Sequence, residues 1–376
     1  MRISYLELRN YKVFEDFEIG FHTRLTVLAG LNGCGKSTVL EAIYDSQSVV
    51  EKMPEVQPRL TFDAETGETH KAFPASAYTA FSDPFFALSW TKRNETDTGQ
   101  IIATPSSEDS VKMPPILLLE MISAPQFDMP SAGKSVAAMK TIANLFISRF
   151  GFSVTNVAGP ENIVVRDENG NEIDLATLGG GIQNIVRLGL ALASATVLDN
   201  QKRGREIDTP APIIACIDNI ELHLHPSWQQ LIITSLLRAF PEAQFIVATH
   251  SSIILSTVRA NSIRTIERDA DGALRAVTPR NEVVGTNADS VLASVLKTSP
   301  TPDNPQRRAI NRLIELIESG EEESDEATEL LSWLTNYYGE HHPVAIDIER
   351  RIRFQKLKQR VPSSAYRAMT DTQGAS

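Results

Sequence analysis

The sequence contains very little cysteine. Only Cys34 and Cys216 occur among its 376 residues, and neither belongs to a Cys-x-x-Cys pair. This excludes a disulfide framework and a cysteine zinc site, and it favours reduced thiols in a cytoplasmic protein. No secretory leader is expected, because the chain enters a strand pattern at Ile3 without the apolar core of a signal peptide.

Long apolar runs and an excess of positive charge are also missing. The apolar run 188–198 falls well short of the roughly 18 to 20 residues that a membrane helix needs, so we expect no membrane association. Acidic residues outnumber basic ones by 47 to 36, which gives a net charge of −11 and a pI near 5.2. Any contact with nucleic acid must therefore be local rather than spread over the surface.

The order of the apolar segments predicts an α/β fold. Short strands are expected at 3–8, 14–21 and 25–29, and the third runs through a glycine-rich turn into a helix that begins at Lys36. Further along, the buried runs 213–217 and 245–248 flank a helical stretch. Strands without polar alternation, separated by helices, are typical of a buried parallel sheet.

Composition changes suggest how the chain is divided. We expect a head over 1–285 that carries a β-rich inserted lobe at 51–135. A helical region at 286–362 follows, with helices at 306–319, 324–338 and 344–359, and the tail 363–376 reads as disordered.

Residues 30–37 match the phosphate-loop pattern G-x-x-x-x-G-K-[ST], in the strand–turn–helix context that gives this pattern its meaning. Glycines let backbone N–H groups converge on phosphates, the Lys36 ammonium adds positive charge, and the Ser37 hydroxyl suits Mg²⁺. The phosphate-binding residues predicted in this way are Asn32, Gly33, Cys34, Gly35, Lys36, Ser37 and Thr38.

The strand 213–217 ends in Asp218, which is the predicted second ligand of Mg²⁺. The next residue is Asn219, where a glutamate that activates water would be expected, and an amide orients water without accepting its proton. If the chain stays extended, Glu221 points to the same side as Asn219 and is the alternative base.

Two further motifs could contact the phosphates. His250 follows the strand 245–248, at the edge where α/β sheets bind ligands, and is a candidate for the γ-phosphate. Gly179, Gly180 and Gly181 precede a helix and could offer backbone N–H donors to an anion, although a triple glycine alone is more often a flexible turn.

Two other groups invite a metal-site interpretation that their spacing disfavours. His223 and His225 lie two residues apart without a third ligand nearby. The carboxylates at 267, 269 and 271 surround an Asp-Gly turn, which favours a hairpin over a nuclease centre.

The last predicted helix is strongly basic. It carries six Lys and Arg residues between 350 and 360, preceded by Asp347 and Glu349. Such a stripe is either a solvated face, a phosphate-binding surface or a dock for an acidic partner, and the dock is favoured over the phosphate surface.

Taken in this order, the motifs resemble the ATP-binding cassette heads of the RecF, SMC and OLD-like group. Residues 8–14 resemble the N-terminal strand pair of that group, residues 178–183 its signature loop and His250 its switch histidine. The run Glu-Leu-His-Leu-His-Pro at 221–226 is more similar to OLD-like ATPases of bacterial antiphage systems, including Septu PtuA-like and retron-associated ones.

The resemblance implies an ABC-type P-loop head that binds ATP and Mg²⁺ and forms a homodimer, or a higher even oligomer, with ATP sandwiched between heads. It also implies a partner effector, such as an HNH nuclease, on the C-terminal helices. Two departures predict slow hydrolysis: Gly179 replaces the usual serine, and Asn219 the usual glutamate. A RecF-like repair ATPase that binds DNA and a standalone ATPase remain as alternatives, and either Gln100 or Gln126 could serve as the Q-loop glutamine.

Overall fold

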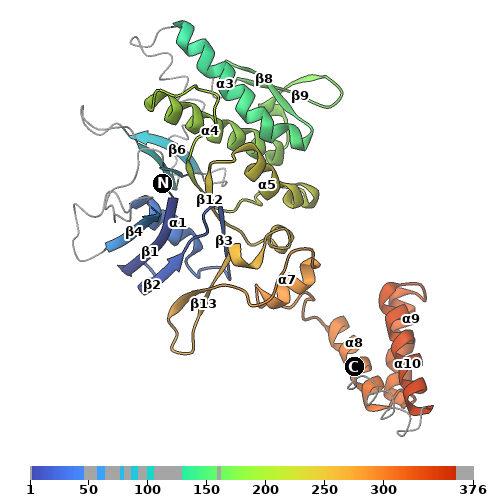
Figure 1. Cartoon of the computed structure of the whole chain (residues 1–376). Helices are drawn as coiled ribbons and strands as arrows, with labels where there is room; N and C mark the ends of the chain where they lie inside the picture. Colours follow the sequence, from blue (N-terminus) through green and yellow to red (C-terminus); the bar gives the residue numbers. More distant parts are fainter. Residues whose placement is uncertain are drawn as a thin grey trace, which may run out of the picture. The chain divides into compact units, whose positions relative to one another are not determined.

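The structure is a computed structural model, and Figure 1 shows its elements. The chain divides into two compact units, Met1–Thr298 and Ser299–Ser376. The residues whose structure is described are 2–45, 57–63, 77–79, 86–91, 100–105, 129–158 and 162–360.

The first unit is built on a six-stranded sheet with the order β14-β13-β3-β12-β11-β5. Its three central strands are parallel and buried at every position, which confirms the predicted parallel sheet. Only β14 runs antiparallel to its neighbour. The strands are β3 (Leu25–Ala29), β5 (Ala77–Thr79), β11 (Ile214–Ile217), β12 (Gln244–Ala248), β13 (Ile263–Arg268) and β14 (Leu274–Val277).

Both faces of this sheet are covered, because alternate side chains of each strand enter different cores. Ala215 and Ile217 pack into the larger core, whereas Ile214 and Cys216 pack into the other. The larger core is formed with α3 (Met129–Ile147), α4 (Gly180–Lys202) and α5 (Pro226–Ala239), and the other with α1 (Lys36–Asp45) and the N-terminal strands. Figure 1 shows these two layers on opposite sides of β3 and β12.

Among the described helices, α4 is long and apolar enough to span a membrane by length and composition. Its most apolar window, however, is 67% buried within the structure. Since α4 packs along α3, its apolar side chains are accounted for as part of the core.

An antiparallel sheet with the order β2-β1-β4 covers α1. Its strands are β1 (Arg2–Tyr11), β2 (Phe14–Gly20) and β4 (Gln57–Asp63). Both β4 and β5 come from the region 51–135 that was expected to be an inserted lobe. They pair with β1 and β11, so part of that region extends the two sheets of the head because their edge strands accept further strands.

The Gln126 backbone and the Gln100 side chain lie outside the described residues, so the choice of Q-loop glutamine stays a prediction.

The remaining described elements of the first unit are short. These elements are the hairpin β6 (Phe86–Thr91) and β7 (Gln100–Pro105), the strands β8 (Ser153–Val157), β9 (Ile163–Arg166) and β10 (Glu172–Asp174), the 3₁₀ turns η1 (Ser148–Phe150), η2 (Leu175–Thr177) and η3 (Ala260–Ser262), and the helices α6 (Ser252–Leu255) and α7 (Ala288–Ser294).

The second unit consists of α8 (Pro305–Ser319), α9 (Asp325–Tyr338) and α10 (Pro343–Arg360) around a separate core. The helices begin and end close to the predicted positions. The boundary, however, falls after Thr298 rather than after residue 285, because Val291, Val295 and Leu296 belong to the core of the first unit. The tail predicted as disordered lies outside the described residues.

Candidate functional site

The glycine-rich turn between β3 and α1 is packed so tightly that two of its positions require glycine. Gly30 and Gly35 have φ angles of 140° and 97°. A Cβ on Gly30 would lie 2.6 Å from the carbonyl oxygen of Ile266, and one on Gly35 would lie 2.4 Å from Cζ of Phe14. Both β13 and the β1–β2 turn therefore hold this loop in place.

The Lys36 side chain is folded back onto the loop. Its ammonium donates hydrogen bonds of 3.0 Å to the carbonyl oxygens of Gly30 and Leu31, and the Cys34 sulfur lies 3.8 Å from it. Burial lowers the pKa of Lys36. Because sulfur is a weak acceptor, the third N–H of the ammonium is available to a stronger one, such as a phosphate oxygen.

Ser37 and Asp218 meet below this loop. The Ser37 hydroxyl donates to Oδ2 of Asp218 at 2.6 Å, and the backbone N–H of Asn219 donates to Oδ1 at 3.0 Å. Burial of this carboxylate raises the pKa of Asp218. A hydroxyl and a carboxylate side by side are hard oxygen donors, so these two residues fit Mg²⁺ that is shared with phosphate.

The raised pKa of Asp218 gives a stability prediction with a definite sign. Between the unfolded pKa and the raised folded pKa, the unfolded chain loses this proton before the folded chain does, so stability falls as pH rises. Asp218→Asn is therefore expected to leave Tm unchanged or higher without nucleotide, and its advantage should grow through that window and then level off. Thermal melts from about pH 4 upward, where unfolded aspartate begins to ionise, would check this, and an advantage that shrinks with rising pH would contradict it.

The chain turns immediately after Asp218, so the condition under which Glu221 would point to the same side as Asn219, an extended chain, is not met. Asn219 has a φ of 47° and His223 a φ of 60°. Backbone hydrogen bonds from Leu222 to Asn219 and from Leu224 to Glu221, both 2.9 Å, close the turn. Asparagine tolerates this left-handed conformation better than glutamate does, which gives a structural reason for the residue at 219.

Glu221 is anchored at the end of β12 instead. Its Oε2 accepts a hydrogen bond of 2.6 Å from the Thr249 hydroxyl, and its Oε1 accepts one of 2.8 Å from the backbone N–H of His250. The Glu221 charge acts on Lys36, Asp218 and His250. Each carboxylate oxygen has a second lone pair, so Glu221 can still accept a proton from water.

His250 completes the group. Burial and the charge of Lys36 lower the pKa of His250, so its imidazole is neutral near pH 7. The structure thus brings together Lys36, Ser37, Asp218 and Glu221 with this histidine. Lys36 and Ser37 begin α1, Asp218 and His250 follow β11 and β12, and Glu221 lies in the turn after Asp218. The exposed positions 31–33 form the outer edge of the phosphate loop.

The sequence alone did not identify the hydrogen-bonded side chains that support this group. The Ser251 hydroxyl donates to Oε1 of Gln229 at 2.6 Å, and Nε2 of Gln229 donates to the Leu224 carbonyl at 2.9 Å. Together with Thr249 these residues tie β12, α5 and the turn after Asp218 to one another. Their polar side chains follow apolar runs, but nothing in their spacing indicates which partners they choose.

The glycine triplet lies against that same turn. A Cβ on Gly181 would lie 2.5 Å from the carbonyl oxygen of His223, and Asn184 donates from Nδ2 to the Leu222 carbonyl at 3.1 Å. Gly179 is the N-cap of α4, and a Cβ there would have no heavy atom within 4 Å. The start of α4 is therefore in direct contact with the segment that carries Glu221.

The carboxylates at 267–271 form a hairpin, as predicted. Asp269 accepts hydrogen bonds from the backbone N–H groups of Asp271 and Ala273 and pairs with Arg275. His225 caps α5 by accepting from the backbone N–H of Ser227. In the part of the chain that the structure describes, no three His, Cys, Asp or Glu side chains are grouped to hold a metal ion.

Comparison with protein families gives one match. Residues 1–47 and 118–255 match the AAA ATPase domain family AAA_15. The two matched segments contain the phosphate loop, the glycine triplet, Asp218, Glu221 and His250.

Curated relatives are similar to part of the chain. The Retron Vc95 probable ATPase of Vibrio cholerae serotype O1 biovar El Tor is 35% identical over 36% of this chain and 26% of its own length. The Retron Ec83 probable ATPase of Escherichia coli is 26% identical over 54% of this chain and 36% of its own. The Septu protein PtuA of Bacillus mycoides (strain KBAB4) is 26% identical over 37% and 22%. The matches thus span between about a fifth and about a third of the relatives' lengths.

Among solved structures, the SMC head domain from Thermotoga maritima is similar with a TM-score of 0.42 and 18% identity. The similarity covers 74% of this chain and 99% of that domain. An ATP-binding cassette of an ABC transporter gives a TM-score of 0.40 and 14% identity over 74% and 90%.

Proposed function

This chain belongs to the AAA ATPase domain family, and on that premise we propose that it binds ATP with Mg²⁺ and hydrolyses it slowly as a subunit of a bacterial antiphage system. The observation that carries the nucleotide site is the 2.6 Å hydrogen bond between Ser37 and Asp218 beneath the phosphate loop. The defence role is supported by the retron and Septu relatives, and it implies a cytoplasmic protein.

The roles of the residues follow from their positions. Backbone N–H groups of the loop 32–38 and the Lys36 ammonium would bind the phosphates, and Ser37 and Asp218 would hold Mg²⁺, which neutralises phosphate charge when bound. Asn219 would orient water through its amide. Glu221 would accept the proton of that water, and the neutral imidazole of His250 would contact the γ-phosphate.

Slow turnover follows from the same geometry. Both oxygens of Glu221 already accept hydrogen bonds, from Thr249 and from the backbone of His250, so one lone pair of each oxygen is occupied. Asn219 carries no proton acceptor of comparable strength. An ATP-dependent switch or clamp therefore fits this site better than an enzyme whose output is ATP turnover.

We further propose that the glycine triplet of one copy completes the nucleotide site of another, which gives a homodimer or a higher even oligomer. Gly179 would face the partner's phosphate with backbone N–H groups only. A hydroxyl at this position would add one hydrogen bond to a charged group, worth about 1.5–3 kcal/mol, and the added Cβ has room.

Light scattering with and without Mg²⁺ and ATP tests this dimer. We expect the wild-type chain to dimerise only with nucleotide, Lys36→Ala to stay monomeric, and Gly179→Ser to tighten the dimer at least tenfold. A monomer at saturating ATP, or a dimer indifferent to Lys36→Ala, would contradict the proposal.

The second unit offers a surface for an acidic partner. One face of α10 exposes Ile346, Phe354 and Leu357, the last two at 64% and 60%. Arg350, Arg353 and Lys358 are exposed on the same helix. Apolar side chains between basic ones suit an acidic amphipathic segment of an effector protein such as a nuclease.

Replacing two exposed apolar side chains of α10 by aspartate tests this surface. Phe354→Asp with Leu357→Asp should abolish copurification of the effector from a host that expresses the native neighbouring genes, while ATP-dependent dimerisation is retained. Glu340→Lys, on the loop before α10, changes the net charge by the same amount with the opposite sign, and this control should leave copurification intact. Retained copurification would contradict the proposed role.

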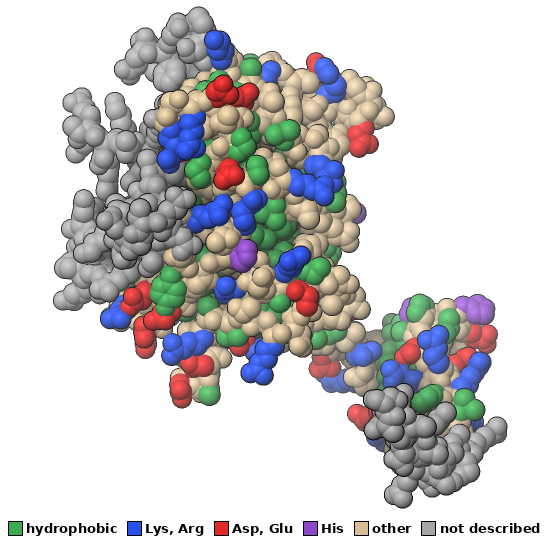
Figure 2. Space-filling model, in the orientation of Figure 1, with side chains coloured by type: hydrophobic (Ala, Val, Ile, Leu, Met, Phe, Trp, Pro, Cys, Tyr) green, Lys and Arg blue, Asp and Glu red, His purple; other side chains and the backbone are tan. Residues whose placement is uncertain are grey.

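DNA binding is the alternative function. On the face seen in Figure 2, Lys and Arg side chains of the first unit are interspersed with Asp and Glu, without a broad basic patch. If the chain binds DNA with an affinity that falls steeply with salt and disappears when the arginines at 350–353 are neutralised, the RecF-like interpretation is favoured instead.

A further inference from the structure

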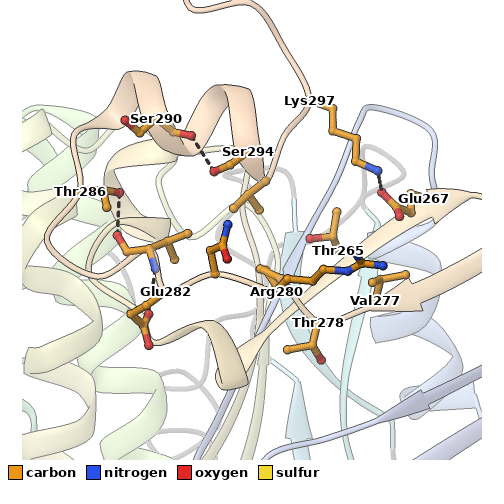
Figure 3. A pocket seen from close by; sticks show the side chains of 14 residues that line it. Thr265, Glu267, Val277, Thr278, Arg280, Glu282, Thr286, Ser290, Ser294 and Lys297 are labelled. Carbon is orange, nitrogen blue, oxygen red and sulfur yellow. Dashed lines mark hydrogen bonds and ion pairs between the residues drawn. The ribbon is translucent and has the colours of Figure 1, made fainter. Parts of the chain in front are cut away.

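A groove lies in the first unit, formed by the β13–β14 hairpin, the segment 278–286, α7 and the residues that follow it (Figure 3). Its volume is about 530 Å³, within the range of roughly 300–1,000 Å³ that is usual for small-molecule sites. None of the residues to which we assign nucleotide binding lines it, so it is a separate site.

Four charged side chains line the groove, and three of them have hydrogen-bond or ion-pair partners. Glu267 forms an ion pair with Lys297, which Figure 3 shows on one side of the groove. Oε1 of Glu282 accepts hydrogen bonds from the backbone N–H groups of Ala260, Val283 and Val284. Arg280 extends along the groove and, within the described parts of the chain, has no acidic partner. The lining thus holds two acidic and two basic side chains, and Arg280 is the basic one without an ion pair in the described residues.

Neutral donors also line the groove. The Thr278 and Ser290 hydroxyls and the Asn281 amide line the groove. By contrast, the hydroxyls of Thr286 and Ser294 already donate to backbone carbonyls. The apolar part of the lining is aliphatic, from Val277, Pro279, Val283 and Val295, and no aromatic side chain is among the lining residues. The lining thus suits a polar carbon body and offers no ring for base stacking.

We propose that this groove binds a small phosphomonoester, with its phosphate on Arg280 and its hydroxyl-bearing body against the other polar side chains of the lining. A guanidinium binds phosphate oxygens bidentately, and the neighbouring hydroxyl and amide donors match its further acceptor oxygens better than they match a two-oxygen carboxylate.

Lys297 can add a second positive charge. Its ion pair with Glu267 is exposed, with 62% of the lysine side chain accessible. Exposed pairs contribute about 0–1 kcal/mol, so a doubly charged phosphate competes well for this ammonium. Lys297 also has a φ of 51°, an uncommon conformation for lysine that is often seen at ligand sites.

Calorimetry with ribose 5-phosphate and AMP tests the proposal. The titrations use Lys36→Ala as background, so that the phosphate loop does not contribute. We expect binding that Arg280→Gln weakens at least tenfold and that Arg280→Lys weakens less, because lysine retains the charge without the bidentate geometry. Arg268→Gln is the matched control: it makes the same change on the same hairpin, where the guanidinium bonds Gly272 outside the groove.

A second set of titrations shows whether the bound phosphate belongs to a small ester or to the end of a nucleic-acid strand. An oligonucleotide with a 5′-phosphate is compared with the same strand ending in a 5′-hydroxyl. Phosphate-dependent binding of either the strand or the small esters supports the site, provided that Arg280→Gln weakens it. Absence of heat at millimolar ligand, equal binding by Arg280→Gln, or equal binding of acetate overturns it. Because Arg280 is exposed, thermal melts of the free variants should coincide with that of the background protein.

Discussion

Replacing Glu221 by glutamine is expected to lower the steady-state rate of ATP hydrolysis by about 10²–10⁴-fold, while ATP binding changes little. Proton acceptance by a positioned side chain typically contributes this much to a rate. The amide of glutamine preserves the contacts of Glu221 with Thr249 and with the backbone of His250, because the Thr249 hydroxyl can accept as well as donate. The measurement is phosphate release under saturating Mg²⁺ and ATP.

Asn219 provides the matched control for this experiment. Asn219→Gly keeps the left-handed backbone at 219 without strain and removes only the side-chain amide. We expect this change to cost less than tenfold in rate. If Asn219→Gly is the more damaging of the two, or if Glu221→Gln leaves turnover intact, the proton acceptor is not Glu221.

The phosphate loop and the central sheet could be predicted from the sequence because their signals are local. A glycine pattern between a strand and a helix, and apolar runs without alternation, need no knowledge of distant contacts. The positions of Lys36, Ser37 and Asp218 follow directly, since parallel strands end at a common edge of the sheet. Here sequence reasoning and structure agree.

The position of Glu221 could not be predicted in this way. Its orientation depends on two left-handed residues, Asn219 and His223, and on a hydrogen bond from Thr249, which follows β12. From the sequence, Asn219 offers a side-chain amide that can orient water without accepting its proton, whereas its backbone conformation favours asparagine on steric grounds. Tertiary contacts also decide the unit boundary, because Val291 and Val295 read as an ordinary amphipathic turn until the core they enter is known.

Gly181→Ala is expected to lower the stability of the protein, because Gly181 lies where α4 contacts the turn after Asp218. Alanine normally stabilises a helix by about 0.5–1 kcal/mol over glycine. Here the added Cβ would lie 2.5 Å from the backbone carbonyl oxygen of His223, so the turn or the helix must move. Overpacking of this kind costs about 1–3 kcal/mol, which exceeds the gain, so Tm should fall.

The same displacement should reach the nucleotide site. The Leu222–Leu224 turn that Gly181 touches is held by Asn184 and continues directly from Glu221, so moving it shifts the carboxylate that we propose as the proton acceptor. Gly181→Ala should therefore slow hydrolysis and lower Tm together, whereas Gly179→Ala, whose Cβ meets no heavy atom within 4 Å, should change Tm by little. Since the glycine triplet is also the surface proposed to meet a partner's nucleotide, this contact would link the state of one site to the geometry of the other. A Gly181→Ala variant with a raised Tm and normal turnover would show that α4 and Glu221 are independent.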